Sequence, residues 1–412
     1  MKSAELLRCS GGLLLAVAVQ AAWAQDAAKV AAPAAAVSAS AGAVAPVAAP
    51  SAPVAAPPVK ERNMTARFSA EKPVLGMPLG SSTTRAHCST DGTAFYDLTA
   101  SGTSAGQQLY GISPEGGVKH LLRKLPIDYT NVLVRDFFAG DKQLVTLLQA
   151  EKRDDGPDAP PRVTDYFLSL EDEAGDLSEL VAMSVRFKPV KVARFASGDV
   201  MALGWDEGNL LPVLAIVKED GSVRRFVDLD AVRPGGARGE GTKTETAIVK
   251  QELATLESLQ GATFVPDGNE VLLTWPGTTK PVIALGAAGE ERTIPIAIPA
   301  GYVLNDVLAS SGGRGLLVVR VKEADVRKPA ADEVAPPPKM MLLEYDAVHG
   351  SRIGRVVFDK PKVEDVTCAP NSLLTAVFYD TIPDANRPVR DAATGAATSE
   401  ATQLVVATAR QF

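Results

Sequence analysis

The chain has 412 residues, of which 46% are hydrophobic and 22% charged, and its formal net charge is −7 at pH 7. This length allows one large domain with an ample core, or two smaller domains. The acidic balance, together with the lack of any basic run or Arg/Lys stripe, argues against nucleic acid as a partner.

The first 24 residues have the three parts of a secretory signal peptide. Lys2 and Arg8 give the positive start, residues 11–22 the apolar stretch, and Ala22-Trp23-Ala24 a small-x-small cleavage site. The apolar stretch is shorter than the roughly 20 residues that a spanning helix needs. We therefore expect cleavage, a mature chain without a transmembrane segment, and a periplasmic or secreted location.

Residues 25–62 are dominated by Ala, Pro and Val and contain no aromatic side chain. Repeated prolines bar a helix and favour an extended chain that cannot build a core. We expect a disordered linker, which either acts as a spacer stalk or has no partner at all. Residues 63–412 are then expected to form the folded domain.

The part expected to fold contains a series of similar stretches. Each has a bulky residue, then a turn cluster, then an apolar strand. In the best copy, residues 261–277, Pro266-Asp267-Gly268-Asn269 supplies the fixed φ, the local side-chain hydrogen bond and the positive φ that a tight turn needs. The copies lie at residues 86–98, 136–150, 193–206, 261–277, 306–321 and 366–380.

Further short strands with Gly-containing turns follow the copies, as in residues 107–125, 211–229 and 339–358. Four hairpin-linked strands per repeat are typical of a β-propeller blade. A lone blade cannot bury both faces, but about six stacked around an axis can. We predict an all-β chain forming a β-propeller of about six four-stranded blades. The alternatives are seven blades, or stacked β-sandwiches, which do not explain the recurring turn.

The last repeat shows only three strands before the sequence ends, in residues 363–369, 373–379 and 402–409. Propellers commonly complete the final blade with a strand from the other end of the chain. We therefore predict that residues between Asn63 and Leu79 supply its fourth strand.

Two segments interrupt the strand pattern. In residues 242–261, Val249, Leu253 and Leu256 recur at helical spacing after a capping box of Thr242 and Glu245, which predicts a helical insertion. Residues 323–339 are Pro-rich and charged, which indicates an exposed loop between strands.

The pattern from Phe264 to Leu272 resembles the WD-like repeats of exported bacterial propellers, including the Tol-type periplasmic propellers. The resemblance covers most of residues 81–412, although only one copy has the full Pro-Asp-Gly form. It implies a propeller fold and a tendency to bind proteins or small ligands. It transfers no catalytic residue.

Two motifs that could carry chemistry lack the context that the chemistry needs. Ser104 lies in Gly-Thr-Ser-Ala-Gly, but strands are expected on both sides, whereas a nucleophile elbow leads from a strand into a helix. Residues 235–244 have the spacing of a phosphate-binding loop, with Thr242 where the lysine belongs. We interpret both as loops and expect no catalytic residue.

The three histidines, His87, His120 and His349, are far apart in the sequence and lie in different strand contexts. No Cys-x-x-Cys, His-Glu-x-x-His or paired-carboxylate motif is present. We therefore expect no metal and no cofactor.

Superposition of the six copies aligns one bulky position in each, namely Cys88, Phe138, Phe195, Phe264, Leu308 and Cys368. These side chains are expected to pack between blades, while residues one and three places earlier lie on the opposite strand face. The polar members of that face could line the axial channel and bind an anionic or polar ligand: Arg85, His87, Arg135, Arg194, Asn305 and Asp365. Alternatively, the channel holds only water and polar side chains, whatever the function.

Cys88 and Cys368 occupy the same place in the first and last copies, which a closed ring makes neighbours. An even cysteine pair in an exported protein favours a disulfide. The alternative is two buried free thiols, if the Cα atoms are more than about 7 Å apart.

These features together indicate an exported, non-catalytic β-propeller that binds or scaffolds, whose partner is a protein, a glycan or a small polar ligand. One alternative is a periplasmic or secreted hydrolase or lyase that uses channel-mouth residues. Another is a structural component of a cell-envelope complex. We expect a monomer.

Overall fold

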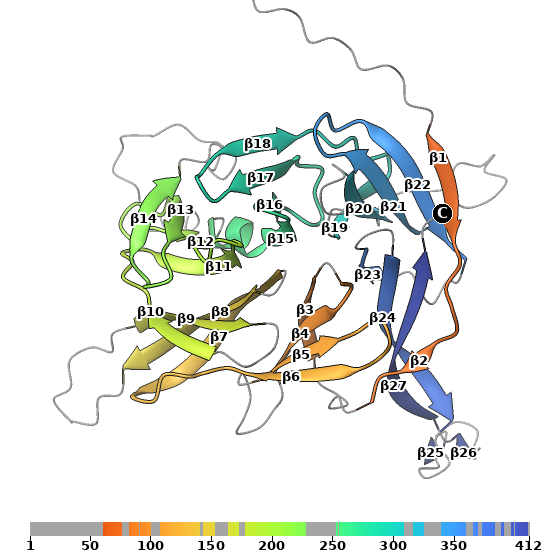
Figure 1. Cartoon of the computed structure of the whole chain (residues 1–412), viewed down its shortest axis with the longest axis horizontal. Helices are drawn as coiled ribbons and strands as arrows, with labels where there is room; N and C mark the ends of the chain where they lie inside the picture. Colours follow the sequence, from red (N-terminus) through yellow and green to blue (C-terminus); the bar gives the residue numbers. More distant parts are fainter. Residues whose placement is uncertain are drawn as a thin grey trace, which may run out of the picture. The chain divides into compact units, whose positions relative to one another are not determined.

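Antiparallel sheets of four strands recur along the chain in the computed structural model (Figure 1). The structure describes residues 61–75, 82–89, 91–99, 108–140, 143–152, 164–172, 178–227, 253, 255–308, 316–324, 339–359, 366–369, 373–383, 389–390, 397–398 and 400–410. These residues belong to one compact unit, Pro57–Phe412. The expected signal peptide, and the linker as far as residue 60, lie outside the described residues.

Six sheets follow one another around a ring, and the chain runs outward in each from the strand nearest the centre, except for the outermost strands of blades 5 and 6, which come from the N-terminal part of the domain (Figure 1). Blade 1 contains β3 (Ser82–Cys88), β4 (Ala94–Thr99), β5 (Gln108–Ile112) and β6 (Val118–Leu122). Blade 2 contains β7 (Tyr129–Gly140), β8 (Gln143–Lys152), β9 (Thr164–Asp172) and β10 (Ser178–Ala182). Blade 3 contains β11 (Lys188–Arg194), β12 (Val200–Trp205), β13 (Pro212–Val217) and β14 (Val223–Val227).

Blade 4 contains β15 (Thr263–Asp267), β16 (Glu270–Thr274), β17 (Val282–Gly286) and β18 (Glu291–Ile294). Blade 5 contains β19 (Tyr302–Val307), β20 (Leu316–Glu323), β21 (Met340–Asp346) and β22 (Arg352–Phe358). Blade 6 contains β23 (Val366–Cys368), β24 (Leu373–Pro383) and β27 (Glu400–Arg410), with the small pair β25 (Val389–Arg390) and β26 (Ala397–Thr398) between the last two. The prediction of a six-bladed β-propeller is confirmed, and the seven-blade and sandwich alternatives are wrong.

The N-terminal part of the domain completes the ring. β2 (Lys72–Pro73) pairs with β27 and is the fourth strand of blade 6, which confirms the predicted source of that strand. β1 (Arg62–Ala66) adds a fifth strand to blade 5, parallel to β22, which the sequence did not predict. Between them, the Ser69 amide donates to the Thr408 carbonyl oxygen at 2.8 Å. Residues 62–74 therefore join blade 5 to blade 6.

The hydrophobic cores lie between blades. β12 is buried at all six positions, because neighbouring blades cover both faces of its sheet. The six aligned bulky residues are also buried, as predicted; Phe138, Phe195 and Phe264 are each exposed by 2% or less and share one core. Burying such a side chain stabilises the fold by about 1.5–3 kcal/mol. The repeated bulky position thus fixes each blade against its neighbour.

The Pro-Asp-Gly stretch forms a tight hairpin between β15 and β16. Asp267 pairs with Glu270 across the turn, and Gly268 has φ of 60°, a left-handed conformation that glycine adopts without a Cβ penalty. Pro266 lies within β15 rather than in the turn, contrary to expectation. It is tolerated there because β15 is the inner edge strand of its sheet.

The predicted helical insertion is helical over residues 255–260, and residues 242–252 lie outside the described residues. Leu253, predicted to lie on the apolar face, is 53% exposed, and the buried positions are Thr255 and Leu259. Thr255 is buried because its hydroxyl donates to the Leu210 carbonyl oxygen at 3.2 Å. No helix in the described part of the chain is long and apolar enough to cross a membrane.

The two ends of the strands carry different connections. Because successive strands run antiparallel, the first-to-second and third-to-fourth connections of every blade share one end, here called the turn end. The second-to-third connections and the links between blades share the other, the loop end. The longest connections join strands at the loop end: residues 153–163, 228–262, 324–339 and 384–399.

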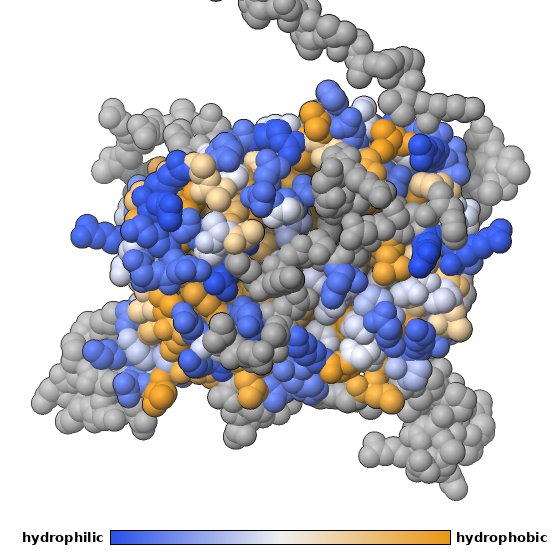
Figure 2. All heavy atoms as spheres, in the orientation of Figure 1, coloured by the Kyte–Doolittle hydropathy of each residue, from blue (hydrophilic) through white to orange (hydrophobic). Residues whose placement is uncertain are grey.

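Charged side chains occupy the outer strands of the ring. Figure 2 shows hydrophilic residues gathered over β14 and β18, and Arg224 and Arg225 of β14 are exposed. Charges on an edge strand disfavour pairing with another sheet. These two outer edges are therefore protected against edge-to-edge association.

Candidate functional site

A cleft of about 410 Å³ opens at the loop end between blades 2 and 3. Its walls come from the inner strands β7 and β11, from β8, β9 and β12, and from the helix at residues 255–260. The lining residues are Arg135, Gln149, Thr164, Tyr166, Lys188, Pro189, Val190, Lys191, Trp205, Leu256 and Gln260. The volume falls within the roughly 300–1,000 Å³ of pockets that hold small molecules.

A β-bulge interrupts each inner strand where it meets the cleft. The register of β7 shifts between Val134 and Asp136, which leaves Arg135 as the extra residue. The register of β11 shifts between Pro189 and Lys191, which leaves Val190 as the extra residue. A bulge bends the strand and redirects a side chain out of the regular alternation. The two bulges thus place adjacent lining residues where regular strands would not.

Three cations line the cleft. Lys188 forms an ion pair with Glu207, and its Nζ lies 5.1 Å from the centre of the Trp205 ring. Lys191 is buried, and its Nζ lies 3.8 Å from Asp136 Oδ1. Both lysines therefore have a carboxylate close by.

Arg135 differs from the two lysines in its partner. Its Nε donates to Gln149 Oε1 at 2.6 Å, and it forms no ion pair with any carboxylate of the described residues. The side chain is exposed to the cleft. The arrangement leaves a guanidinium that an amide holds in place and that no carboxylate of the described residues neutralises.

Tyr166 contributes a neutral hydroxyl to the same wall. Burial raises the pKa of Tyr166, the nearby Arg135 lowers it, and Glu207 raises it, with a net increase above 10.0. The hydroxyl therefore stays protonated near neutral pH and can donate a hydrogen bond.

The axial region holds a much smaller void, of about 20 Å³. Its walls include the residues one place before the bulky positions of blades 1, 4, 5 and 6, namely His87, Thr263, Val307 and Thr367. Such a void has room for about one water molecule. The His87 ring is buried with its centre 4.8 Å from that of Phe137 and 5.7 Å from that of Phe138. Among these residues, His87 belongs to the predicted axial set, whereas Thr263, Val307 and Thr367 were not named in it.

Of the other five residues of the predicted axial set, the three whose side chains the structure describes do not line this void. Arg135 lines the cleft, and the side chain of Arg85 and all of Asp365 lie outside what the structure describes. At the turn end, Arg194 Nη2 lies 3.3 Å from Glu219 Oε1. With its amide oxygen facing Arg320, Asn305 accepts two hydrogen bonds of 2.9 Å. Ligand binding by this set stays a prediction.

Inner-strand bulges explain why Arg135 and Asn305, each three places before the bulky position, do not line the axial void with His87. Register shifts fall between Thr83 and Ala86 and between Leu304 and Asp306, as they do in β7, so positions three places earlier are out of phase with positions one place earlier. The prediction assumed unbroken alternation, which a bulge removes.

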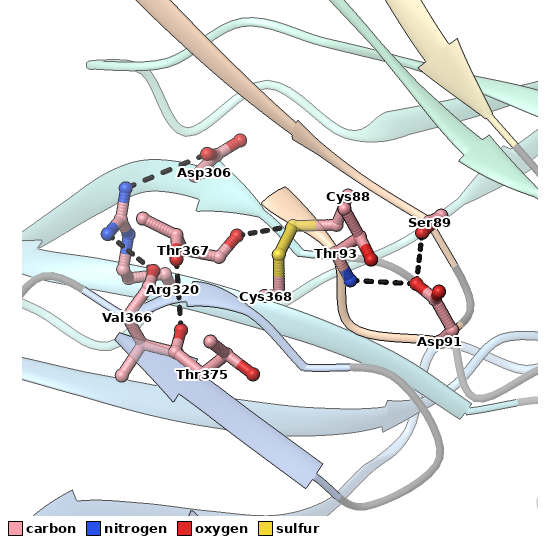
Figure 3. The surroundings of a disulfide bond; sticks show 10 residues. All are labelled: Cys88, Ser89, Asp91, Thr93, Asp306, Arg320, Val366, Thr367, Cys368 and Thr375. Carbon is pink, nitrogen blue, oxygen red and sulfur yellow. Dashed lines mark hydrogen bonds and ion pairs between the residues drawn. A yellow bond between two sulfur atoms is a disulfide. The ribbon is translucent and has the colours of Figure 1, made fainter. Parts of the chain in front are cut away.

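Cys88 of blade 1 and Cys368 of blade 6 are joined by a disulfide in the structure (Figure 3). Their Cα atoms are 5.6 Å apart. This separation is below the limit of about 7 Å for a disulfide, whereas the alternative of two free thiols needed a larger one. Cys88 Sγ also lies 2.7 Å from the Thr367 carbonyl oxygen; because a disulfide sulfur carries no hydrogen, this approach is a packing contact. The oxidation state in solution stays a prediction.

The other motifs give no site within the described residues. No group of three or more His, Cys, Asp or Glu side chains there is placed to hold a metal ion. The His120 ring packs on Tyr110 at 4.5 Å, and His349 Nδ1 lies 2.9 Å from Asp346 Oδ2. Ser104 and residues 235–244 lie outside the described residues.

Sequence reasoning named Arg135 but missed the rest of the cleft. The one local signal was Lys-Pro-Val-Lys at 188–191, which places two cations at the start of an inner strand. Tyr166 and Trp205 look like ordinary strand residues in the sequence. They become lining residues because blades 2 and 3 pack side by side and bring these strands to one cleft.

No protein-family model and no curated protein matches this chain. Solved structures with a similar fold include a subtype N11 neuraminidase-like protein of A/flat-faced bat/Peru (10% identity, TM-score 0.35) and an oligogalacturonate lyase in complex with manganese (11%, 0.36). They cover 85% of this chain each, and 94% and 98% of those chains. A quinoprotein alcohol dehydrogenase-like protein of Bacteroides thetaiotaomicron (9%, 0.28) covers 68% of this chain and 67% of its own. At these values the likeness carries no argument about activity or ligand, and no family match supports the specific WD-like or Tol-type resemblance.

Proposed function

We propose that this propeller is a binding protein that acts outside the cytoplasm and takes a small polar ligand in the cleft between blades 2 and 3. One observation carries the proposal: a cavity of small-molecule size whose wall combines apolar and polar side chains, at the end of the ring that bears the longest connections. Ligand sites are commonly built from connections that a rigid scaffold positions.

The proposed location rests on the sequence. The signal-peptide pattern of the first 24 residues supports export. A disulfide between Cys88 and Cys368 is compatible with an oxidising compartment. Fractionation of cells that produce the full chain tests this part, since recovery of the unprocessed protein in the cytoplasm would contradict it.

The test of the cleft is to fill it. Thr164 lines the cavity at the start of β9, so Thr164→Trp should occupy part of the volume where a ligand would sit. Thr293→Trp, at an exposed position of the outer strand β18, is the matched control. Native mass spectrometry of each protein after incubation with a small-molecule extract of the producing cells measures bound mass.

We expect a ligand adduct on the wild type and on Thr293→Trp, and its loss on Thr164→Trp. An adduct that persists on Thr164→Trp would place binding elsewhere. No adduct on any of the three proteins would count against a small-molecule binding role.

A further inference from the structure

The balance of charge in the cleft points to the kind of ligand. Lys188 and Lys191 each face a carboxylate, from Glu207 and Asp136 respectively. Among the described side chains, the partner of Arg135 is the uncharged amide of Gln149. The cleft therefore retains one positive charge that no described side chain balances, and a bound anion would neutralise it.

The hydrogen bond to Gln149 determines which edge of Arg135 is free. It engages Nε, and neither Nη atom makes a hydrogen bond to the residues that the structure describes. Two Nη donors in one plane match the two oxygens of a carboxylate or phosphate, and such paired bonds to a charged acceptor are short and strong. A lysine would offer a point charge without that geometry.

The remaining polar side chains suit hydroxyl groups. Thr164 and Tyr166 supply hydroxyls and Gln260 an amide, and none of the three makes a side-chain hydrogen bond to the described protein. Each can both donate and accept. A cavity of about 410 Å³ has room for a small molecule that bears several hydroxyls as well as an acidic group.

We infer that the ligand is a hydroxylated small molecule bearing a carboxylate or a phosphate, and that Arg135 binds this acidic group through its two Nη atoms. This inference rests on the proposed function of the cleft. It assigns the anion-binding role to one residue, which makes it testable by one substitution.

The experiment is isothermal titration calorimetry of the full chain with four probes: D-glucuronate, D-glucose 6-phosphate, D-glucose and inorganic phosphate. The variants are Arg135→Gln and, as a control, Arg225→Gln on the exposed outer strand β14. Arg135 is exposed and makes one side-chain hydrogen bond within the described part of the chain, so its replacement should leave folding intact, which a thermal melt checks.

We expect at least one acidic sugar to bind the wild type at least tenfold more tightly than glucose, and less tightly as salt rises. Arg135→Gln should remove that preference, and Arg225→Gln should keep it. Binding of glucuronate alone would identify a carboxylate ligand, and binding of glucose 6-phosphate alone a phosphate ligand.

Four results would overturn the inference: equal affinity for glucose and both acidic sugars, an unchanged preference in Arg135→Gln, inorganic phosphate binding as tightly as glucose 6-phosphate, or no binding by any probe. If the extract adduct is lost on Thr164→Trp but one of these results is obtained, the proposed function stands and only the ligand class is wrong.

Discussion

At the scale of single residues, buried charges concentrate where blade 1 meets blade 2. Arg123 Nη1 lies 2.8 Å from Asp97 Oδ1, with side-chain exposures of 0% and 6%. Glu171 of β9 is 2% exposed, accepts a 2.6 Å hydrogen bond from the Ser169 hydroxyl, and is near enough to Arg123 to be affected by its charge. One guanidinium thus serves two buried carboxyl groups.

Replacement of Asp97 by Asn should destabilise the protein by about 3–5 kcal/mol, because it leaves Arg123 buried without its close carboxylate. Urea denaturation at neutral pH measures the loss. Glu207→Gln is the control, since it removes an ion pair from the solvent-exposed Lys188 and should cost less than about 1 kcal/mol. Equal effects of the two substitutions would show that burial does not determine the strength of the Asp97 pair.

Glu171 should make stability depend on pH. Burial raises its pKa from 4.5 to about 7, against the lowering effect of Arg123. Between these values the folded protein keeps a proton that the unfolded chain has released, so the contribution of Glu171 to stability is largest at low pH and falls as pH rises toward 7. The contribution of Glu171 to the free energy of unfolding falls by about 3 kcal/mol at most.

Glu171→Gln cannot titrate, so its stability relative to the wild type should rise by roughly 2–3 kcal/mol from pH 5 to pH 8 in urea denaturation. Asp267, whose pKa burial raises to about 6, titrates in both proteins and cancels in the comparison. Parallel pH profiles for the two proteins would contradict a buried, proton-holding Glu171.

At the scale of elements, the inner strands and the N-terminal strands depart most from the regular repeat. The bulges in β7 and β11 give the cleft Arg135 and Val190, and β1 and β2 link blades 5 and 6. Phe68 and Val74, beside these N-terminal strands, are 7% and 6% exposed. The N-terminal segment is therefore part of the domain core.

Deletion of residues 61–80 should lower the melting temperature by roughly 5–15 °C, because buried side chains worth about 1.5–3 kcal/mol each are lost together with the closing strand. Differential scanning calorimetry measures the shift. Deletion of residues 26–60 is the control and should leave the melting temperature unchanged. An unchanged value for the first deletion would show that the ring closes without β1 and β2.

At the scale of the whole molecule, two devices close the ring between its ends. β2 completes blade 6 by hydrogen bonds to β27, and the Cys88–Cys368 disulfide joins blade 1 to blade 6 across a sequence separation of 280 (Figure 3). In the chain-entropy model, a covalent link lowers the entropy of the unfolded chain, and the effect grows with the length of the closed loop. For a loop this long it stabilises the folded state by up to about 4–5 kcal/mol.

The double substitution Cys88→Ala/Cys368→Ala should lower the melting temperature, and it should make deletion of residues 61–80 more damaging than in the wild type. The reason is that both devices oppose the same ring opening, so their losses are not additive. Non-reducing mass spectrometry of the natively purified protein provides the direct check. Two thiols that alkylate after unfolding would rule out the disulfide.

The sequence by itself determined the blades and their order. A bulky residue, a turn and an apolar strand recur at equivalent places, and such local patterns are visible because side-chain periodicity and turn chemistry act over a few residues. The same reasoning located the closing strand and aligned Cys88 with Cys368. Only the tertiary structure decided the cleft, because its walls come from segments between Arg135 and Gln260 that meet when blades 2 and 3 pack together. The bulges escaped prediction for a related reason: an extra residue in β7 or β11 is defined by the register against the neighbouring strand, which no single strand records.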